Sequence, residues 1–259
     1  MGFAVILAEA IASPIIPAQA ATSGFMTGFL LLAAHMVLDD LNRRSDAGDQ
    51  PTRNKSVRVV RSREAFSIAI VLASFSLLFA ASLGLSTLLI ALLSVVVIFV
   101  HHAKTWKIHV LSNAFVGANT AIIFIFAGFA VGGLTRMLTV FAAMTFPSSM
   151  GREAAKNLAK SSDDTTTSTE TVAGSNRGGQ SGRESALLFL ATVMLSLVPP
   201  VLRLVSINYL PLIVICDVGF LMTAYSMLTS PTPRNAKRNS KYVPVWLSFG
   251  LFAFVIGTI

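Results

Sequence analysis

Long apolar segments alternate with shorter polar segments along the whole chain of 259 residues. A helix needs about 20 mostly apolar residues to cross the hydrocarbon core of a bilayer. Nine segments approach that length and character: 2–18, 23–38, 65–82, 84–102, 110–132, 136–151, 186–204, 208–229 and 242–259. The pattern predicts an all-α protein: a polytopic membrane bundle of about nine transmembrane helices. We expect residues 1–259 to form one domain, and the pattern assigns no oligomeric state.

The composition supports a membrane protein. The chain is 54% hydrophobic and 12% charged, with a mean hydropathy of +0.71. Soluble domains carry about 25% charged residues, so a soluble domain is excluded. Within the apolar segments, Pro199 and Pro200 should interrupt a helix. Asp217 is interpreted as a structural hydrogen-bond partner. Glu9 is expected to line a cavity, to pack between helices or to lie at the membrane interface.

Positive charge is confined to alternate polar segments. Of the 20 Lys and Arg residues, 18 lie in four segments: 39–64, 101–109, 150–185 and 230–241. Loops rich in Lys and Arg stay in the cytoplasm, so these segments should form a cytoplasmic polar cap on a cell-membrane protein. The N-terminus should then be cytoplasmic. The net charge of +8 is explained by this topology and by attraction to anionic lipids, so no nucleic-acid partner is expected.

The first candidate site follows the second apolar segment. His35, Asp39, Asn42 and Asp46 are spaced by four, three and four residues, so on a continuous helix they would share one face. Clustered carboxylates beside Arg suit Mg²⁺ that bridges phosphate oxygens, while Arg holds the remaining charge. The alternative is a solvated, charged loop after a helix end.

The second candidate site follows the sixth apolar segment. Arg152, Lys156 and Lys160 would share one helical face, with Asn157 beside them. Such a face could bind an anion such as a phosphate group. The alternative is the basic flank of a membrane span. We expect the segments 39–64 and 150–185 to form cytoplasmic loops that approach each other.

Together, these features resemble the UbiA superfamily of intramembrane prenyltransferases. Its first motif is Asn-x-x-x-Asp-x-x-x-Asp, and His35, Asp39 and Arg43 take these positions. Its second motif, in the archaeal branch, is Gly-Arg-Glu-x-x-Lys-Asp-x-x-Asp. Four positions of that motif match, whereas Asn157 and Lys160 replace the acids; the matching residues are Gly151, Arg152, Glu153 and Lys156. The archaeal branch transfers a geranylgeranyl group to geranylgeranylglyceryl phosphate and makes the second ether bond of archaeal membrane lipids.

The resemblance implies a Mg²⁺-dependent transferase that acts on a prenyl diphosphate and a lipid acceptor. The implied catalytic residues are Asp39, Asp46, Arg152 and Lys156, and the implied metal ligands are Asp39, Asp46 and Asp163. The implied substrate-binding residues are His35, Asp49, Arg53, Lys104, Lys107, Asn113, Asn157 and Lys160. The replaced acids leave two alternatives open: a non-catalytic UbiA-like protein, or a lipid-binding or transport protein.

Overall fold

The computed structural model describes residues 2–13, 16–46, 62–102, 109–160 and 171–258. These residues form helices and the turns that join them. The helices are α1 (Gly2–Ala12), α2 (Ala18–Asp46), α3 (Ser62–Ala81), α4 (Leu85–His102), α5 (His109–Ala130), α6 (Arg136–Lys160), α7 (Thr171–Ser196), α8 (Val198–Val201), α9 (Tyr209–Thr229) and α10 (Pro233–Gly257). The expected bundle of about nine helices is confirmed, since α8 is a single turn.

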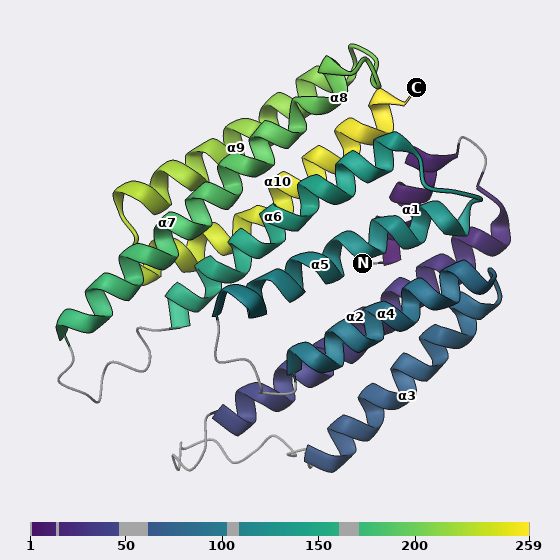
Figure 1. Cartoon of the computed structure of the whole chain (residues 1–259), viewed down its shortest axis with the longest axis horizontal. Helices are drawn as coiled ribbons and strands as arrows, with labels where there is room; N and C mark the ends of the chain where they lie inside the picture. Colours follow the sequence, from purple (N-terminus) through teal and green to yellow (C-terminus); the bar gives the residue numbers. More distant parts are fainter. Residues whose placement is uncertain (1, 14–15, 47–61, 103–108, 161–170, 259) are drawn as a thin grey trace.

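Consecutive long helices run antiparallel, so the helix ends gather at two faces of the bundle (Figure 1). We call one face the motif end; there α2 and α6 end and α3 and α7 begin, at the lower left of Figure 1. The opposite end carries the turns at 82–84, 131–135 and 202–208. The two candidate sites therefore belong to one face of the bundle, although more than 100 residues separate them.

Several helices begin or end at other residues than the apolar pattern predicted. The first helix, α1, has only 11 residues, and Gly2 faces Phe25 of α2. The sixth continues nine residues past the apolar segment to Lys160, because Ala, Glu, Lys and Leu are good helix formers. Segments 39–64 and 150–185 are thus partly helical rather than loops; α2 includes residues 39–46, and α7 includes 171–185.

The last helix also begins earlier than its apolar segment. It starts at Pro233, where the Thr232 side chain accepts a hydrogen bond from the Asn235 amide at 3.3 Å. A Thr cap followed by Pro is a strong helix start, and the apolar pattern alone did not reveal it.

Aromatic side chains fill the centre of the bundle. The Phe141 ring of α6 lies 4.7 Å, centroid to centroid, from both Phe124 of α5 and Phe254 of α10. Tyr209 of α9 packs edge-on against Phe254 at 5.3 Å. Gly219 lets α9 approach α10, because a side chain there would collide with the Trp246 ring. The core thus joins helices from both halves of the chain.

The outer surface is apolar along the middle of the helices. Large hydrophobic side chains are exposed on α3, α4, α7, α9 and α10; examples are Leu78, Leu89, Met194, Met222 and Phe252. Six described helical segments are long and apolar enough to cross a membrane, and α4 adds the slightly shorter Leu85–His101. An exposed apolar surface of this extent fits lipid rather than water. The protein is a multi-pass membrane protein.

Two expectations for the seventh and eighth apolar segments are met: a helix break at the prolines, and a hydrogen-bonded, partly buried Asp217. The helix α7 stops at Ser196, and Pro199 and Pro200 lie in the short α8. Ser196 donates to the Asp217 carboxylate at 2.8 Å, while the Tyr209 hydroxyl donates to the Ser196 carbonyl oxygen at 2.8 Å. Asp217 is therefore a structural hydrogen-bond partner that ties α9 to the end of α7.

Candidate functional site

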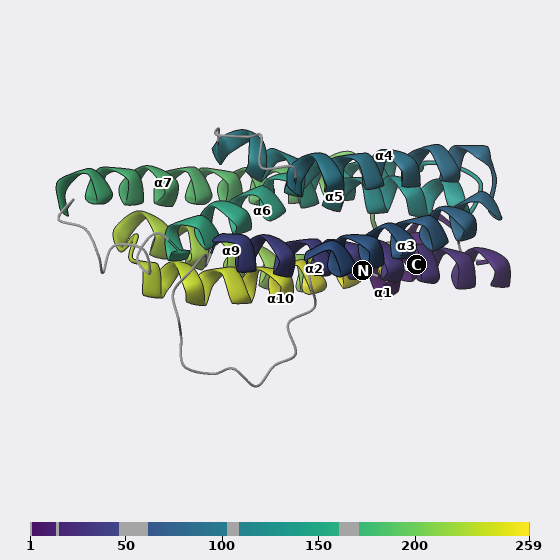
Figure 2. The same ribbon diagram turned by 90° about the horizontal axis from the view of Figure 1, so that it is seen from below.

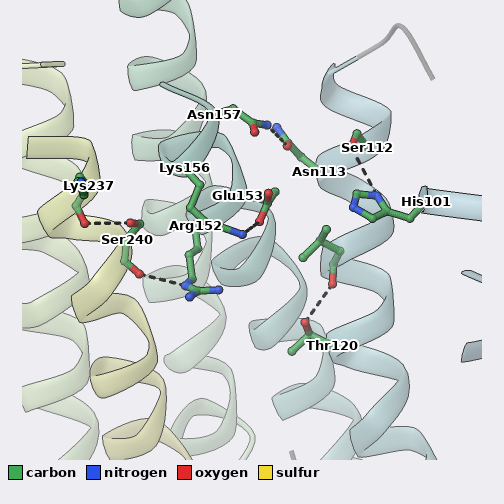
Figure 3. Close-up of polar contacts among 11 residues, drawn as sticks. His101, Ser112, Asn113, Thr120, Arg152, Glu153, Lys156, Asn157, Lys237 and Ser240 are labelled. Atoms are coloured by element: carbon green, nitrogen blue, oxygen red, sulfur yellow. Dashed lines mark hydrogen bonds and ion pairs between the residues drawn. The ribbon is translucent and has the colours of Figure 1, made fainter. Parts of the chain in front are cut away.

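The motif end brings polar side chains from α2, α4, α5, α6 and α10 together. The last turns of α6, residues 151–160, are the centre of this group (Figure 3). Gly151 begins these turns; its carbonyl oxygen accepts a hydrogen bond from Ser185 of α7 at 2.8 Å. A side chain at 151 would press against Phe189, about 3.0 Å from the added carbon. Gly151 thus allows α7 to pack closely against the polar turns.

Arg152 points from α6 toward α10. Its Nε donates to the backbone carbonyl oxygen of Ser240 at 3.0 Å, as Figure 3 shows. Arginine has five N–H donors, and this bond uses only the one on Nε. The hydrogen bond therefore fixes the plane of the guanidinium while its terminal amino groups can hold an anion.

Lys156 pairs with an acid of its own helix. Its Nζ lies 2.6 Å from Oε2 of Glu153, and the side chains are 26% and 12% exposed, respectively. The exposed fractions place the pair at the edge of the protein interior rather than in bulk water. Lys156 is held in position, and two of its three ammonium hydrogens are not used by this single contact.

An amide pair joins α6 to α5. Asn157 Nδ2 donates to Oδ1 of Asn113 at 2.9 Å, and Asn113 is buried. These two residues come from different predicted binding segments. The structure brings them into direct contact and makes the second candidate site part of a connected polar network.

Two imidazoles lie near the same end. The rings of His35 in α2 and His101 in α4 have centroids 6.2 Å apart, and Ser112 of α5 lies 3.5 Å from Nδ1 of His101. His35 is thus brought beside the helix that carries Asn113. No sequence pattern indicated a contact between these two histidines, because they are 66 residues apart.

The remaining predicted residues are placed by backbone only or are outside the described part. Asp39 and Asp46 belong to α2, and Lys160 is the last residue of α6. Because α2 is continuous, positions 35, 39, 42 and 46 fall on one side of it, as the spacing predicted. The predicted residues outside the described part are Asp49, Arg53, Lys104, Lys107 and Asp163.

Among the side chains that the structure describes, no group of three His, Cys, Asp or Glu could hold a metal ion. Mg²⁺ in phosphate-transfer sites needs only one or two protein carboxylates, because substrate oxygens and water complete its shell. Positions 39 and 46 lie two helical turns apart on one side of α2. Aspartate carboxylates are the type of ligand that Mg²⁺ prefers, so the chemistry of these two residues suits the ion.

The family model described as the UbiA prenyltransferase family matches residues 1–254. The chain belongs to the UbiA prenyltransferase family. A digeranylgeranylglyceryl phosphate synthase of Korarchaeum cryptofilum is 28% identical over 228 residues, which are 88% of this chain and 81% of that protein. The enzyme of the same name from Methanococcus vannielii is 31% identical over 172 residues, 66% of this chain and 61% of that protein.

Solved structures of the UbiA family share the fold. A structure described as giving insights into digeranylgeranylglyceryl phosphate synthase in membranes aligns with a TM-score of 0.77 at 24% identity. The alignment covers 100% of this chain and 92% of that chain. A UbiA homologue from Archaeoglobus fulgidus aligns with a TM-score of 0.59 at 15% identity, over 98% of this chain.

Several members of the polar network, among them Glu153, His101 and Ser240, were not predicted as site residues. Glu153 was noted only as a motif match, although opposite charges three residues apart on a helix indicate its pairing with Lys156. His101 was not assigned to the site, because it and His102 end an apolar segment, where an interfacial position accounts for them. Ser240 contributes a backbone oxygen, which no side-chain motif can reveal.

Proposed function

We propose that this UbiA family member is a Mg²⁺-dependent prenyltransferase of the cell membrane. It transfers a geranylgeranyl group from geranylgeranyl diphosphate to a lipid acceptor, geranylgeranylglyceryl phosphate. The observation that carries this proposal is the convergence of Arg152, Lys156 and the Asn113–Asn157 pair at the motif end of a lipid-exposed bundle. The archaeal relatives with this activity in their names support the choice of acceptor.

The diphosphate is assigned to the end of α6. Arg152 and Lys156 are one turn apart on the same side of the helix, and both are partly buried, so their charges are less screened than those of exposed cations. Arginine binds phosphate oxygens through parallel N–H bonds, and lysine supplies a compact charge. The fixed guanidinium of Arg152 lowers the entropy lost when the diphosphate binds.

Asp39 and Asp46 are assigned as the carboxylates that hold Mg²⁺ opposite these cations, with Asp163 as a further ligand. Bound there, Mg²⁺ supplies charge neutralisation for the leaving diphosphate. The remaining substrate contacts are assigned to His35, Asn113, Asn157 and Lys160, together with four residues outside the described part: Asp49, Arg53, Lys104 and Lys107.

The reaction breaks the allylic carbon–oxygen bond, and the diphosphate leaves with the electron pair. The acceptor hydroxyl oxygen then forms an ether bond to the same carbon and releases its proton. Positive charge develops on the prenyl carbon before the new bond forms, so water must be excluded from it. The apolar helices next to the motif end provide a dry path for the isoprenoid chain and keep water from the cation.

The orientation of the protein is part of the proposal. We assign the motif end and the N-terminus to the cytoplasmic side. The support is the concentration of Lys and Arg in the polar segments at that end. The diphosphate head of the prenyl donor would then face the cytoplasm.

A second candidate is a lipid-binding or transport protein that has kept the fold without catalysis. Two features favour it. Arg43 and Lys160 occupy acidic positions of the family motifs, and the carboxylate of Glu153 is already engaged by Lys156.

One assay separates these candidates. Purified protein in lipid nanodiscs is incubated with geranylgeranyl diphosphate, geranylgeranylglyceryl phosphate and Mg²⁺, and the diether product and diphosphate are quantified by mass spectrometry. The enzyme should form both in equal amounts, and chelation of Mg²⁺ should stop the reaction. Binding of both substrates without product would support the second candidate and overturn the first.

A further inference from the structure

The cytoplasmic-side turns of α10 carry a strongly basic outer face. Arg234, Lys237, Arg238 and Lys241 follow a spacing of three, one and three residues, so they cover one side of two helical turns. All four side chains are exposed. Together with Tyr242 and Val245 they line an open pocket. We call these four cations the basic face of α10.

The charges of the basic face are not neutralised by the described part of the protein. The described ion pair at the motif end is Lys156–Glu153, and none joins the basic face to a described acid. The face also points away from the candidate active site. Arg152 reaches α10 at Ser240, on the side of the helix where Ala236 and Val243 are buried. In Figure 2, α10 runs along the lower edge of the described helices.

Along α10, the side chains that follow the basic face change from aromatic to apolar. After Lys241 come Tyr242 and Trp246, whose rings lie 6.2 Å apart. Exposed hydrophobic side chains continue on the same side, at Val245, Phe252 and Ile256. The exposed ring is that of Tyr242, whereas Trp246 packs against Gly219 of α9. Tyrosine prefers the membrane–water interface, so Tyr242 places the basic face at the level of lipid headgroups. The order matches one amphiphile: an anionic head, an interfacial region and a hydrocarbon chain.

We propose that the basic face of α10 binds an anionic phospholipid of the surrounding membrane. The lipid phosphate lies among the four cations, and one hydrocarbon chain runs along Val245, Phe252 and Ile256. A lipid of the bilayer fits better than a substrate of the active site, because the face is directed outward and lies next to exposed apolar residues. The site is separate from the proposed transferase function and does not require it.

The test uses the fluorescence of Trp246. The chain has two tryptophans, so Trp106→Phe leaves Trp246 as the only one. The protein is placed in phosphatidylcholine nanodiscs containing a small fraction of either brominated phosphatidylglycerol or brominated phosphatidylcholine, because bromine quenches nearby tryptophan. Each cation near an anionic surface strengthens binding about fivefold. We therefore expect several-fold stronger quenching by the anionic lipid at equal fractions.

Charge removal then tests the assignment to α10. In the variant with Arg234, Lys237, Arg238 and Lys241 all changed to Gln, the ratio of quenching by the two lipids should fall to about one. The double variant with Arg234→Gln and Arg238→Gln should give an intermediate ratio. It keeps the proposal testable if the quadruple variant does not fold. Arg136→Gln with Arg203→Gln, two exposed cations at the opposite end, is the matched control and should keep the full preference.

Each contrary outcome overturns the proposal. Equal quenching by both lipids in the parent protein means that the face does not select anionic lipid. An unchanged preference in both charge variants places the lipid elsewhere. Loss of the preference on addition of millimolar inorganic phosphate identifies a site for free phosphate rather than for a membrane lipid.

Discussion

Arg152 of α6 and Ser240 of α10 are joined by a 3.0 Å hydrogen bond from the guanidinium Nε to a backbone carbonyl oxygen. The residues are 88 positions apart in the chain. Their hydrogen bond connects the matching positions of the second motif to the last membrane helix. Because the acceptor belongs to the backbone, the position of α10 rather than the identity of residue 240 sets the direction of Arg152. Substitutions at Arg152 are therefore the most direct test of the site.

Arg152→Ala should lower turnover with both substrates by about 10²-fold, because a strong electrostatic contact to the leaving diphosphate is lost. Arg152→Lys keeps the charge but loses the planar donor group, so it should recover only part of the rate. Initial rates measured over a range of geranylgeranyl diphosphate concentrations give kcat and KM. The control is Arg203→Ala, an exposed cation at the opposite end. Equal rates for Arg152→Ala and the parent would remove Arg152 from the site.

Asp39→Ala should reduce Mg²⁺-dependent turnover by about 10²–10³-fold, since a carboxylate that holds the metal is lost. The measurement is the rate as a function of Mg²⁺ concentration. Asp39→Glu should shift the curve to higher Mg²⁺ with a smaller loss of rate, because the carboxylate is kept but moved. If Asp39→Ala turned over normally with the parent's Mg²⁺ dependence, the metal would have to be assigned to other residues.

The Asn113–Asn157 pair should contribute to stability through its hydrogen bond. Asn113 is buried, so Asn157→Ala leaves its amide oxygen without this donor and should cost about 1–3 kcal/mol of unfolding free energy. The double variant Asn113→Ala and Asn157→Ala should cost less than the sum of the two single changes. Thermal unfolding in detergent, followed by circular dichroism, ranks the variants. Additive losses would show that the two amides do not interact.

Glu9 and Gly24 pack against each other at the interface of α1 and α2. The Glu9 side chain is fully buried, and a carbon added at Gly24 would collide with its Oε1. Gly24→Ala should therefore destabilise the protein by about 1–3 kcal/mol. Adding Glu9→Ala should recover most of this loss because it removes the colliding carboxylate.

Gly133→Ala is the matched control for this pair, since no described atom other than those of its chain neighbours lies within 4 Å of the carbon it would add. The melting temperatures of the four proteins in one detergent decide the result. A Gly24→Ala variant as stable as the parent, or one that Glu9→Ala does not rescue, would contradict the packing of α1 on α2.

Single cysteines should report one orientation for both motif segments. In a Cys216→Ala background, cysteines at Ser45 of α2 and Ser175 of α7 should resist a membrane-impermeant maleimide added to intact cells. Ser86→Cys at the start of α4, exposed at the opposite end, should be labelled under the same conditions. Labelling of only one of Ser45→Cys and Ser175→Cys would place the two motif segments on different sides and remove the shared site.

The two candidate sites show what the spacing of residues along the chain can predict and what it cannot. The four-three-four spacing of His35, Asp39, Asn42 and Asp46 predicted one helical side, and a continuous α2 confirms it for the backbone. The spacing of Arg152 and Lys156 likewise predicted a helix. It did not reveal where that helix ends, because the apolar segment stops at 151 while strong helix formers continue to 160.

The sequence by itself determined the class of protein, the approximate set of helices and the shared side of the two motifs. These properties depend on apolar length and on alternation of charge, which act along the chain and need no partner. The tertiary structure decided which polar groups meet. Arg152 contacts a carbonyl of α10, Asn157 contacts Asn113 of α5, and His35 lies near His101. Such contacts depend on how helices pack side by side, and helix packing is set by the fit of aromatic and glycine surfaces such as Phe141 and Gly219 rather than by any local pattern.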